Sequence, residues 1–145
     1  TMDKESTKVR EFLFKKAELL GAIRLPNTAF KNAGTKVTAD ILFLQKREKE
    51  IENPEWIAVT EDAQGFRINS YFVQHPEMIL GTMQEISGPY GMETTCVEKE
   101  GVPLGERLRA AISHITGHIP ERVEEERAEF RYTGRKKGRY HSVPD

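Results

Sequence analysis

One stretch limits the fold of this chain more than any other: two apolar segments separated by a polar loop within residues 19–46. The first segment, residues 20–25, stops at Pro26, which has no backbone N–H to offer a neighbouring strand. The second, residues 39–44, is almost continuously apolar after Asp40, a pattern typical of a strand covered on both faces. These segments predict two strands of a common sheet joined by a loop.

The loop between the two segments contains the turn formers Asn27, Asn32 and Gly34 around one aromatic residue, Phe30. A large apolar side chain in a polar loop either fills a local core or contacts a ligand. Core packing is the commoner role for such a side chain, and the residues alone leave both interpretations open.

Length and composition indicate one domain, or one domain and a tail, with a modest core in a chain of 145 residues. Charged residues make up 31% of the chain and the net charge is -1, so the overall charge argues neither for nor against binding to nucleic acid. The single cysteine, Cys96, excludes an internal disulfide and fits a reducing compartment. Because no apolar run is long enough for a membrane span and the N-terminus is polar, we expect a cytoplasmic protein without a membrane partner.

The N-terminal residues 1–18 predict an amphipathic helix that Asp3, Ser6 or Thr7 could cap. The strand at residues 20–25 follows almost without a linker, so we expect a tight helix–strand unit, half of a βαβ crossover. The predicted apolar stripe of this helix contains Val9, Phe12, Leu13, Lys16, Ala17 and Leu20.

The remaining elements are shorter. Residues 45–56 read as a charged linker, and strands near residues 55–60 and 66–68 can form a hairpin. Asn69 can cap a short helix carrying Tyr71 and Phe72, for which core packing is favoured over stacking on bases. A second helical turn begins at Pro76, a hairpin with a long turn covers residues 82–98, and an amphipathic helix covers residues 104–115.

Motifs that carry chemistry are missing from the sequence. It contains no GxG turn, no phosphate-binding P-loop and no nucleophile elbow. His114 and His118 stand at the spacing of a helical zinc site, but the predicted helix stops between them and no third ligand is evident, so we expect no metal. We accordingly assign no catalytic residue.

The segments LLGAIRLPNTAF and AGTKVTADILFLQKR, together with the opening TMDK, resemble the carboxyl-terminal half of the catalytic domain of adenine-N6 DNA methyltransferases. The similarity is to the methylase domains fused to helicases in very large proteins of mobile elements. A looser similarity is to the modification subunits of type I restriction systems. The resemblance covers residues 1–47, and more loosely residues 69–95 (INSYFVQHPEMILGTM, then YGMETT).

This resemblance implies an α/β fold, or α+β for an isolated fragment. Residues 1–47 would be the last helix–strand–loop–strand unit of a Rossmann-like methyltransferase sheet. Residues 48–117 would add strands, a short helix, a hairpin and a helix, and residues 118–145 a charged tail or linker. The parent protein would use S-adenosylmethionine, but this chain lacks the Gly-rich turn that holds it. Gly88-Pro89-Tyr90 cannot replace the family's Pro-Pro tetrapeptide, since it has one proline and no side chain at Gly88. The chain alone should neither bind the cofactor nor catalyse.

The resemblance also implies substrate contacts. The loop would border the pocket that receives an adenine swung out of the duplex, with Phe30 contacting the base and Lys31 and Lys36 approaching phosphates. The full set of pocket candidates is Pro26, Asn27, Phe30 and Thr35. Separately, the tail alternates basic residues with tyrosines, which suits either DNA contact or, as we favour, a linker. Its basic residues are Arg135, Lys136, Lys137 and Arg139.

The expected partners are double-stranded DNA and the upstream half of the methyltransferase, with a helicase domain following in the parent protein. The edge of the strand at residues 41–44 could pair with residues 56–60 or with a second copy of the chain. Three roles remain open: a methyltransferase fragment that contacts the target base, a DNA-binding module, or a structural connector between methylase and helicase portions.

Overall fold

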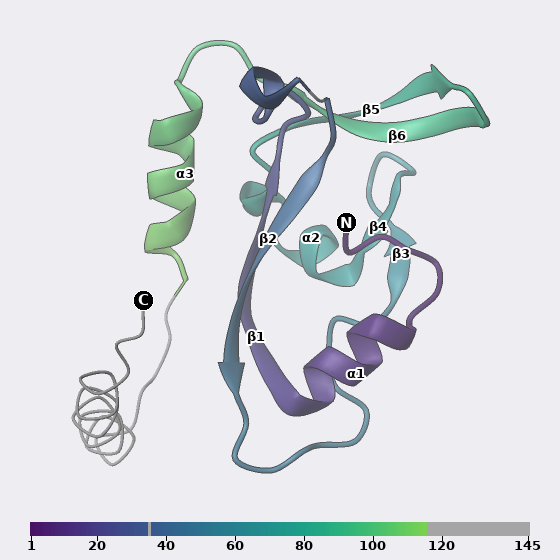
Figure 1. Ribbon diagram of the computed structural model, residues 1–145, viewed down its shortest axis with the longest axis vertical. Helices are drawn as coiled ribbons and strands as arrows, with labels where there is room; N and C mark the ends of the chain where they lie inside the picture. The colour runs from purple at the N-terminus through teal and green to yellow at the C-terminus, as the bar shows by residue number, and fades with distance from the viewer. Residues whose placement is uncertain (35, 116–145) are drawn as a thin grey trace, which may run out of the picture.

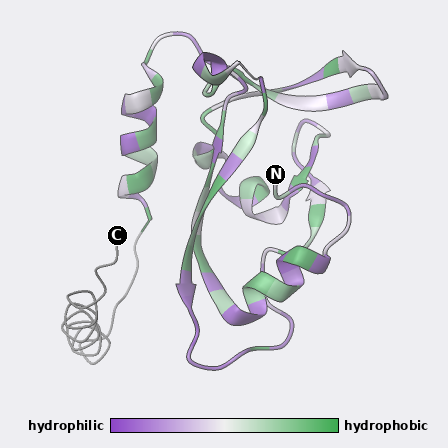
Figure 2. Cartoon of the chain, viewed as in Figure 1, coloured by the Kyte–Doolittle hydropathy of each residue, from purple (hydrophilic) through white to green (hydrophobic). Residues whose placement is uncertain are grey.

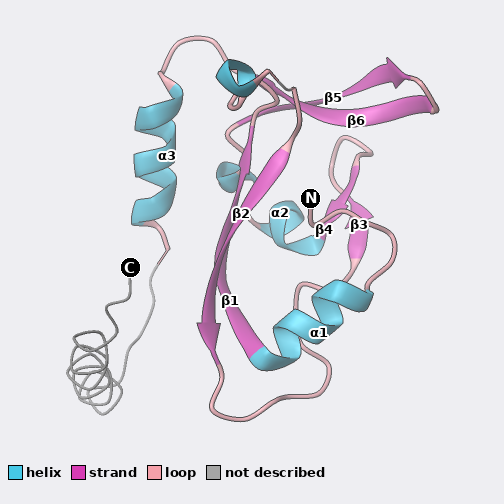
Figure 3. Ribbon diagram, viewed as in Figure 1, coloured by secondary structure: helices cyan, strands magenta, loops and turns pink. Residues whose placement is uncertain are grey.

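The computed structural model describes residues 1–34 and 36–115 (Figure 1). Within these residues the fold is mixed α+β, with three two-stranded antiparallel sheets and three α-helices (Figure 3). None of the described helices has the length and apolar character needed to cross a membrane. The elements are α1 (Lys8–Lys16), β1 (Ala17–Leu25), η1 (Lys31–Ala33), β2 (Ala39–Lys46), β3 (Val59–Glu61), β4 (Arg67–Asn69), α2 (Ser70–Gln74), η2 (Pro76–Met78), β5 (Gly81–Gly88), β6 (Gly91–Glu98) and α3 (Leu104–Ser113).

The predicted strand–loop–strand is the long pair β1–β2, in which Ile23 lies opposite Ile41. This confirms that the two apolar segments share one sheet. β1 is buried almost throughout, and a parallel bridge joins Arg24 on its other side to Ile79. β2 is only partly buried and Leu44 is exposed, so the expectation that β2 is covered on both faces is wrong. The reason is its position, since β2 is the outer strand of the pair.

Helix α1 is shorter than predicted, because the chain passes directly from Lys16 into β1. Its buried side chains are Arg10 and Phe14, whereas Phe12 is 62% exposed and Val9 is exposed as well. The predicted apolar stripe is therefore wrong. Phe14 rather than Phe12 packs in the core, because the rest of the core lies against that face of the helix.

The hairpin β3–β4 and the helix α2 confirm the prediction for the middle of the chain, with shorter strands. The Asn69 side chain caps α2 by accepting a hydrogen bond from the Tyr71 backbone N–H at 2.8 Å. Tyr71 and Phe72 are buried with their rings edge to face, which confirms core packing. Because β3 pairs with β4, the proposed pairing of residues 56–60 with β2 is wrong.

The hairpin β5–β6 extends away from the rest of the fold (Figure 1). Gly88 lies opposite Gly91, so only Pro89 and Tyr90 connect the strands and the turn is shorter than predicted. Tyr90 at this tip is 97% exposed. Helix α3 lies on the opposite side of the β1–β2 pair from α1, as Figure 1 shows.

One hydrophobic core joins both predicted segments, residues 1–47 and 48–117. It contains Phe14 and Ile23 from the first segment and Phe72, Met78 and Cys96 from the second. In Figure 2, α1 and α3 each carry both hydrophobic and hydrophilic residues, as expected for helices with one covered face.

Candidate functional site

The loop between β1 and β2 is the region where the sequence places the substrate contacts. Pro26 directly follows the last residue of β1 and is fully buried, so the start of the loop is packed against the interior of the protein. The short helix η1 follows, and Gly34 ends it with a φ of 79°, a left-handed conformation that glycine adopts without strain. This local structure gives the loop a defined turn and leaves Phe30 40% exposed.

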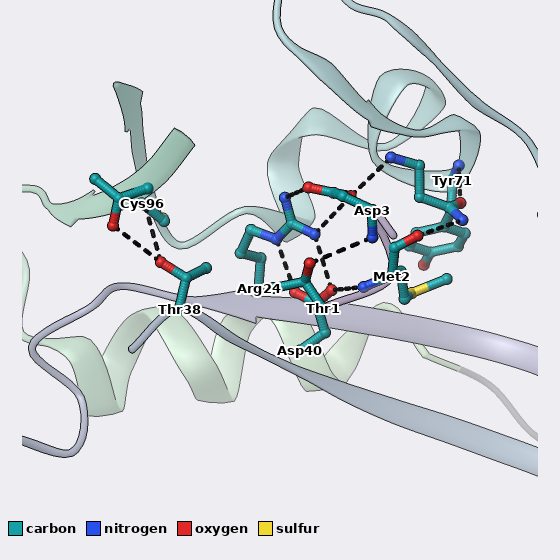
Figure 4. Close-up of polar contacts among 10 residues, drawn as sticks. Thr1, Met2, Asp3, Arg24, Thr38, Asp40, Tyr71 and Cys96 are labelled. Carbon is teal, nitrogen blue, oxygen red and sulfur yellow. Dashed lines mark hydrogen bonds and ion pairs between the residues drawn. The ribbon is translucent and has the colours of Figure 1, made fainter. Parts of the chain in front are cut away.

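Both ends of this loop are tied to β6. At the first end, the Asn27 backbone N–H donates to the Cys96 carbonyl at 2.7 Å, and the Asn27 side chain donates to the Thr95 hydroxyl at 3.1 Å. At the other end, the Thr38 hydroxyl accepts a hydrogen bond from the Cys96 backbone N–H at 3.1 Å (Figure 4). These hydrogen bonds hold the described parts of the loop to β6 at both of its ends.

The predicted site residues thus fall into two groups. Pro26 is buried and Asn27 is engaged with β6, so the structure gives both a local supporting role. Phe30, Lys31 and Lys36 are exposed on the same loop. Thr35 lies outside the described residues, as do the tail candidates Arg135, Lys136, Lys137 and Arg139.

The most unusual feature of the described structure is a buried ion-pair network of Arg24, Asp40 and Asp3, near the ends of β1 and β2 that meet the loop. The Arg24 side chain is 1% exposed and the Asp40 side chain 3%. Arg24 donates to Asp40 from Nε at 2.7 Å and from Nη2 at 2.8 Å. It also donates to Asp3 from Nη1 at 2.6 Å and from Nη2 at 2.8 Å (Figure 4). One guanidinium therefore binds two carboxylates from distant parts of the chain.

The two carboxylates accept further hydrogen bonds from the backbone. The Met2 N–H donates to Asp40 at 2.7 Å, and the Asn69 N–H donates to Asp3 at 2.8 Å. The Phe72 ring lies beneath the guanidinium, 4.6 Å from its central carbon. The network thereby joins the N-terminal segment, β1, β2 and the start of α2.

Electrostatics make this network a structural element and not an acid–base site. Burial is the largest single influence and lowers the pKa of Arg24, but the hydrogen bonds to Asp40 and Asp3 and the negative charges of these two carboxylates together raise it. A guanidinium of this kind stays protonated and cannot exchange a proton with a substrate. The predicted role of Asp3 as a helix cap is wrong, because α1 begins only at Lys8. In the structure, the Asp3 carboxylate accepts hydrogen bonds from Arg24.

The one thiol of the chain is also unsuited to catalysis. Cys96 is completely buried, and this burial raises its pKa to about 11. A reactive cysteine needs a thiolate near neutral pH, which this environment disfavours. Among the described residues, no cluster of His, Cys, Asp and Glu side chains could hold a metal ion, and His118 lies outside them.

Sequence reasoning missed the Arg24 network, although a signal was present. Arg24 and Asp40 are each a charged residue within an apolar strand, each near the end that meets the loop. Opposite charges at such matching positions predict a cross-strand pair, and Arg24 does lie opposite Asp40 in the register. Asp3 carried no comparable signal.

Comparisons with known proteins identified no relative. No protein-family model matches the sequence, and neither the curated proteins nor the solved structures gave a match.

Proposed function

We propose that this chain is the substrate-side end of the catalytic domain of an adenine-N6 DNA methyltransferase and acts by contacting DNA around the target base. The observation that carries the proposal is the order α1, β1, loop, β2, with the anchored loop presenting Phe30 to solvent. This order corresponds to the last helix–strand–loop–strand unit of a Rossmann-like methyltransferase sheet, as implied by the sequence resemblance.

The loop has the physical properties that recognition of a flipped base requires. An enzyme that modifies a base removes it from the stack and holds it by stacking and edge contacts. An aromatic ring on a loop fixed at Asn27 and Thr38 can serve as such a contact without a large loss of entropy on binding. This favours a ligand-contacting role for Phe30 over a purely structural one.

Charge on the loop supports the same role. Lys31 and Lys36 are exposed, and no acidic residue occurs between Pro26 and Asp40. Lysines at such positions can neutralise phosphates on either side of an extruded base, which positions the duplex without reading its sequence.

Methyl transfer itself requires other parts of the proposed enzyme. S-adenosylmethionine would supply the methyl group, and a Gly-rich turn and a Pro-Pro tetrapeptide would have to come from outside this chain. The expected partners are accordingly the cofactor-binding half of the methyltransferase and double-stranded DNA.

The test is Phe30→Ala in a methyltransferase that contains this chain. We expect the KM for DNA to rise and kcat to fall, while the affinity for S-adenosylmethionine stays unchanged, because the ring contacts only the target nucleotide. Phe12→Ala is the matched control, since Phe12 is an exposed aromatic residue on α1. A loss of cofactor affinity with normal DNA parameters would refute the assignment.

A DNA-binding module without methyl transfer is the alternative that the exposed Lys31 and Lys36 favour. The isolated chain would then shift a labelled duplex, and binding would weaken as salt is added. A chain that binds no DNA alone would leave the methyltransferase role and the connector role, which a methylation assay with the cofactor-binding half would separate.

A further inference from the structure

The hairpin β5–β6 ends in an apolar tip, formed by Ile86, Tyr90 and Met92, that is exposed to solvent. Tyr90 is 97% exposed, and Ile86 and Met92 are exposed as well. Exposed apolar residues that gather in one place mark interaction sites, and tyrosine and methionine are enriched in protein interfaces. The tip therefore has the composition of an interaction surface.

The charge of the hairpin has one sign. Glu85 and Glu93 lie near the tip and are exposed, and residues 81–98 contain no lysine, arginine or histidine. The third acidic residue, Glu98, lies at the other end of β6, where its carboxylate accepts a hydrogen bond from the Thr28 hydroxyl at 2.6 Å. A surface that fits the tip is therefore both apolar and basic.

The loop between β1 and β2 is a surface of this kind. Phe30 and Val37 are exposed on it, and Lys31 and Lys36 are exposed beside them. Residues 26–39 contain no aspartate or glutamate. The chain thus carries two surfaces that complement each other in both apolar character and charge.

The tip points away from the loop of its own chain. The base of the hairpin is joined to the loop by the hydrogen bonds between Thr95 and Asn27 and between Cys96 and Thr38. From this base the strands run outward (Figure 1), so that Tyr90 lies about 15 Å beyond Thr95 at about 3.4 Å per residue. The surface that the tip covers must therefore belong to another molecule.

A second copy of the chain satisfies this geometry. Two hairpins that lie side by side and run in opposite directions bring the tip of each copy to the hairpin base of the other. Because the loop is attached to that base, each tip then meets the loop of the other copy. The span from base to tip is the same in both copies, so the contact is reciprocal and closes as a two-fold dimer.

We propose that the chain forms a two-fold dimer in which the hairpin tip of each copy packs on the β1–β2 loop of the other. The apolar side chains of the tip contact Phe30 and Val37, and its two glutamates lie near Lys31 and Lys36. This inference goes beyond the proposed function and does not depend on it, because it uses neither DNA nor a cofactor. The dimer covers Phe30, so DNA and the second copy would compete for the same loop.

Sedimentation velocity of the full chain is the first test, at concentrations up to about 1 mM because a small interface associates weakly. We expect the average sedimentation coefficient to rise with concentration. Tyr90→Ala should raise the dissociation constant of the dimer about tenfold or more, the change expected for a tyrosine at the centre of an interface. Phe12→Ala is the matched control, since Phe12 is an exposed aromatic residue on α1, and it should associate as the unmodified chain does. A chain that stays monomeric, or normal association of Tyr90→Ala, would overturn the proposal.

Charge reversal tests which surfaces meet. One variant combines Glu85→Lys with Glu93→Lys, and the other combines Lys31→Glu with Lys36→Glu. Each variant alone should be monomeric because its tip and its loop carry like charges, whereas an equimolar mixture should dimerise because every tip then faces a loop of opposite charge. All four side chains are exposed, so the changes leave the core intact. A mixture that stays monomeric would contradict the assigned contact.

Discussion

Replacement of Asp40 by alanine should strongly destabilise the protein. Asp40 is the more buried of the two carboxylates that bind Arg24, at 3% side-chain exposure against 18% for Asp3. Its removal takes two short hydrogen bonds from a guanidinium that is 1% exposed. The Met2 N–H also loses its acceptor, so the N-terminal segment is released from β2.

The expected magnitude follows from these contacts. Removing one partner of a buried ion pair costs about 3–5 kcal/mol, because the other charge stays buried without compensation. In this protein Asp3 still accepts two hydrogen bonds from Arg24, so we expect the free energy of unfolding to fall by about 3 kcal/mol, the lower end of that range. Since a domain of this size has about 5–15 kcal/mol of stability in total, the variant should unfold at a clearly lower urea concentration.

Urea unfolding can be followed by the fluorescence of Trp56, the single tryptophan, which packs edge to face against Tyr71. The matched control is Glu50→Ala, which breaks the exposed pair between Lys16 and Glu50 and should change the unfolding midpoint little. A cost for Asp40→Ala below about 1 kcal/mol would refute the reasoning, because it would place the pair in the range of surface ion pairs.

Two further predictions concern the contact between β5 and β6. A Cβ at Gly81 would overlap the backbone carbonyl of Val97, so Gly81→Ala should lower the free energy of unfolding in urea by about 1–3 kcal/mol. The control is Gly105→Ala in α3, where the added Cβ meets open space, and this change should be neutral or stabilising by about 0.5–1 kcal/mol. Burial raises the pKa of Cys96 to about 11, so the unfolded thiol ionises first and the free energy of unfolding should fall as pH rises toward that value. Cys96→Ala should reduce this slope, and an unchanged slope would contradict the assignment.

The sequence predicted the elements whose periodicity is local. Both strands of the β1–β2 pair, the Asn69 cap of α2 and the hairpin β5–β6 follow from apolar runs, turn residues and caps that neighbours in the chain determine. The buried face of α1 could not be predicted in this way. Val9 and Phe12 are as apolar as Phe14, and only the contact with the rest of the core decides which of them is covered.

For the candidate site too, the local features could be predicted from the sequence and the contacts between distant residues could not. The loop with Phe30, Lys31 and Lys36 is visible in the sequence, since Pro26 and Gly34 mark its turns. Its anchoring to β6 is not visible, because Asn27 and Thr95 are 68 positions apart. The pairing of Asp3 with Arg24 is equally remote, and an acidic residue near a predicted helix start is more simply read as a cap.

The buried ion pair favours the observed register of the β1–β2 pair, in which Arg24 lies opposite Asp40. Successive side chains of a strand point to opposite faces, so a slip of one residue would turn Asp40 away from Arg24 and leave both charges buried and unpaired. Such a slip is therefore far more costly than it would be between two apolar strands. The same register places Thr38, whose hydroxyl accepts a hydrogen bond from the Cys96 backbone N–H at the end of the loop. A change that only weakened β1–β2 packing would lower stability, whereas a change that freed the register would also displace the loop that carries Phe30.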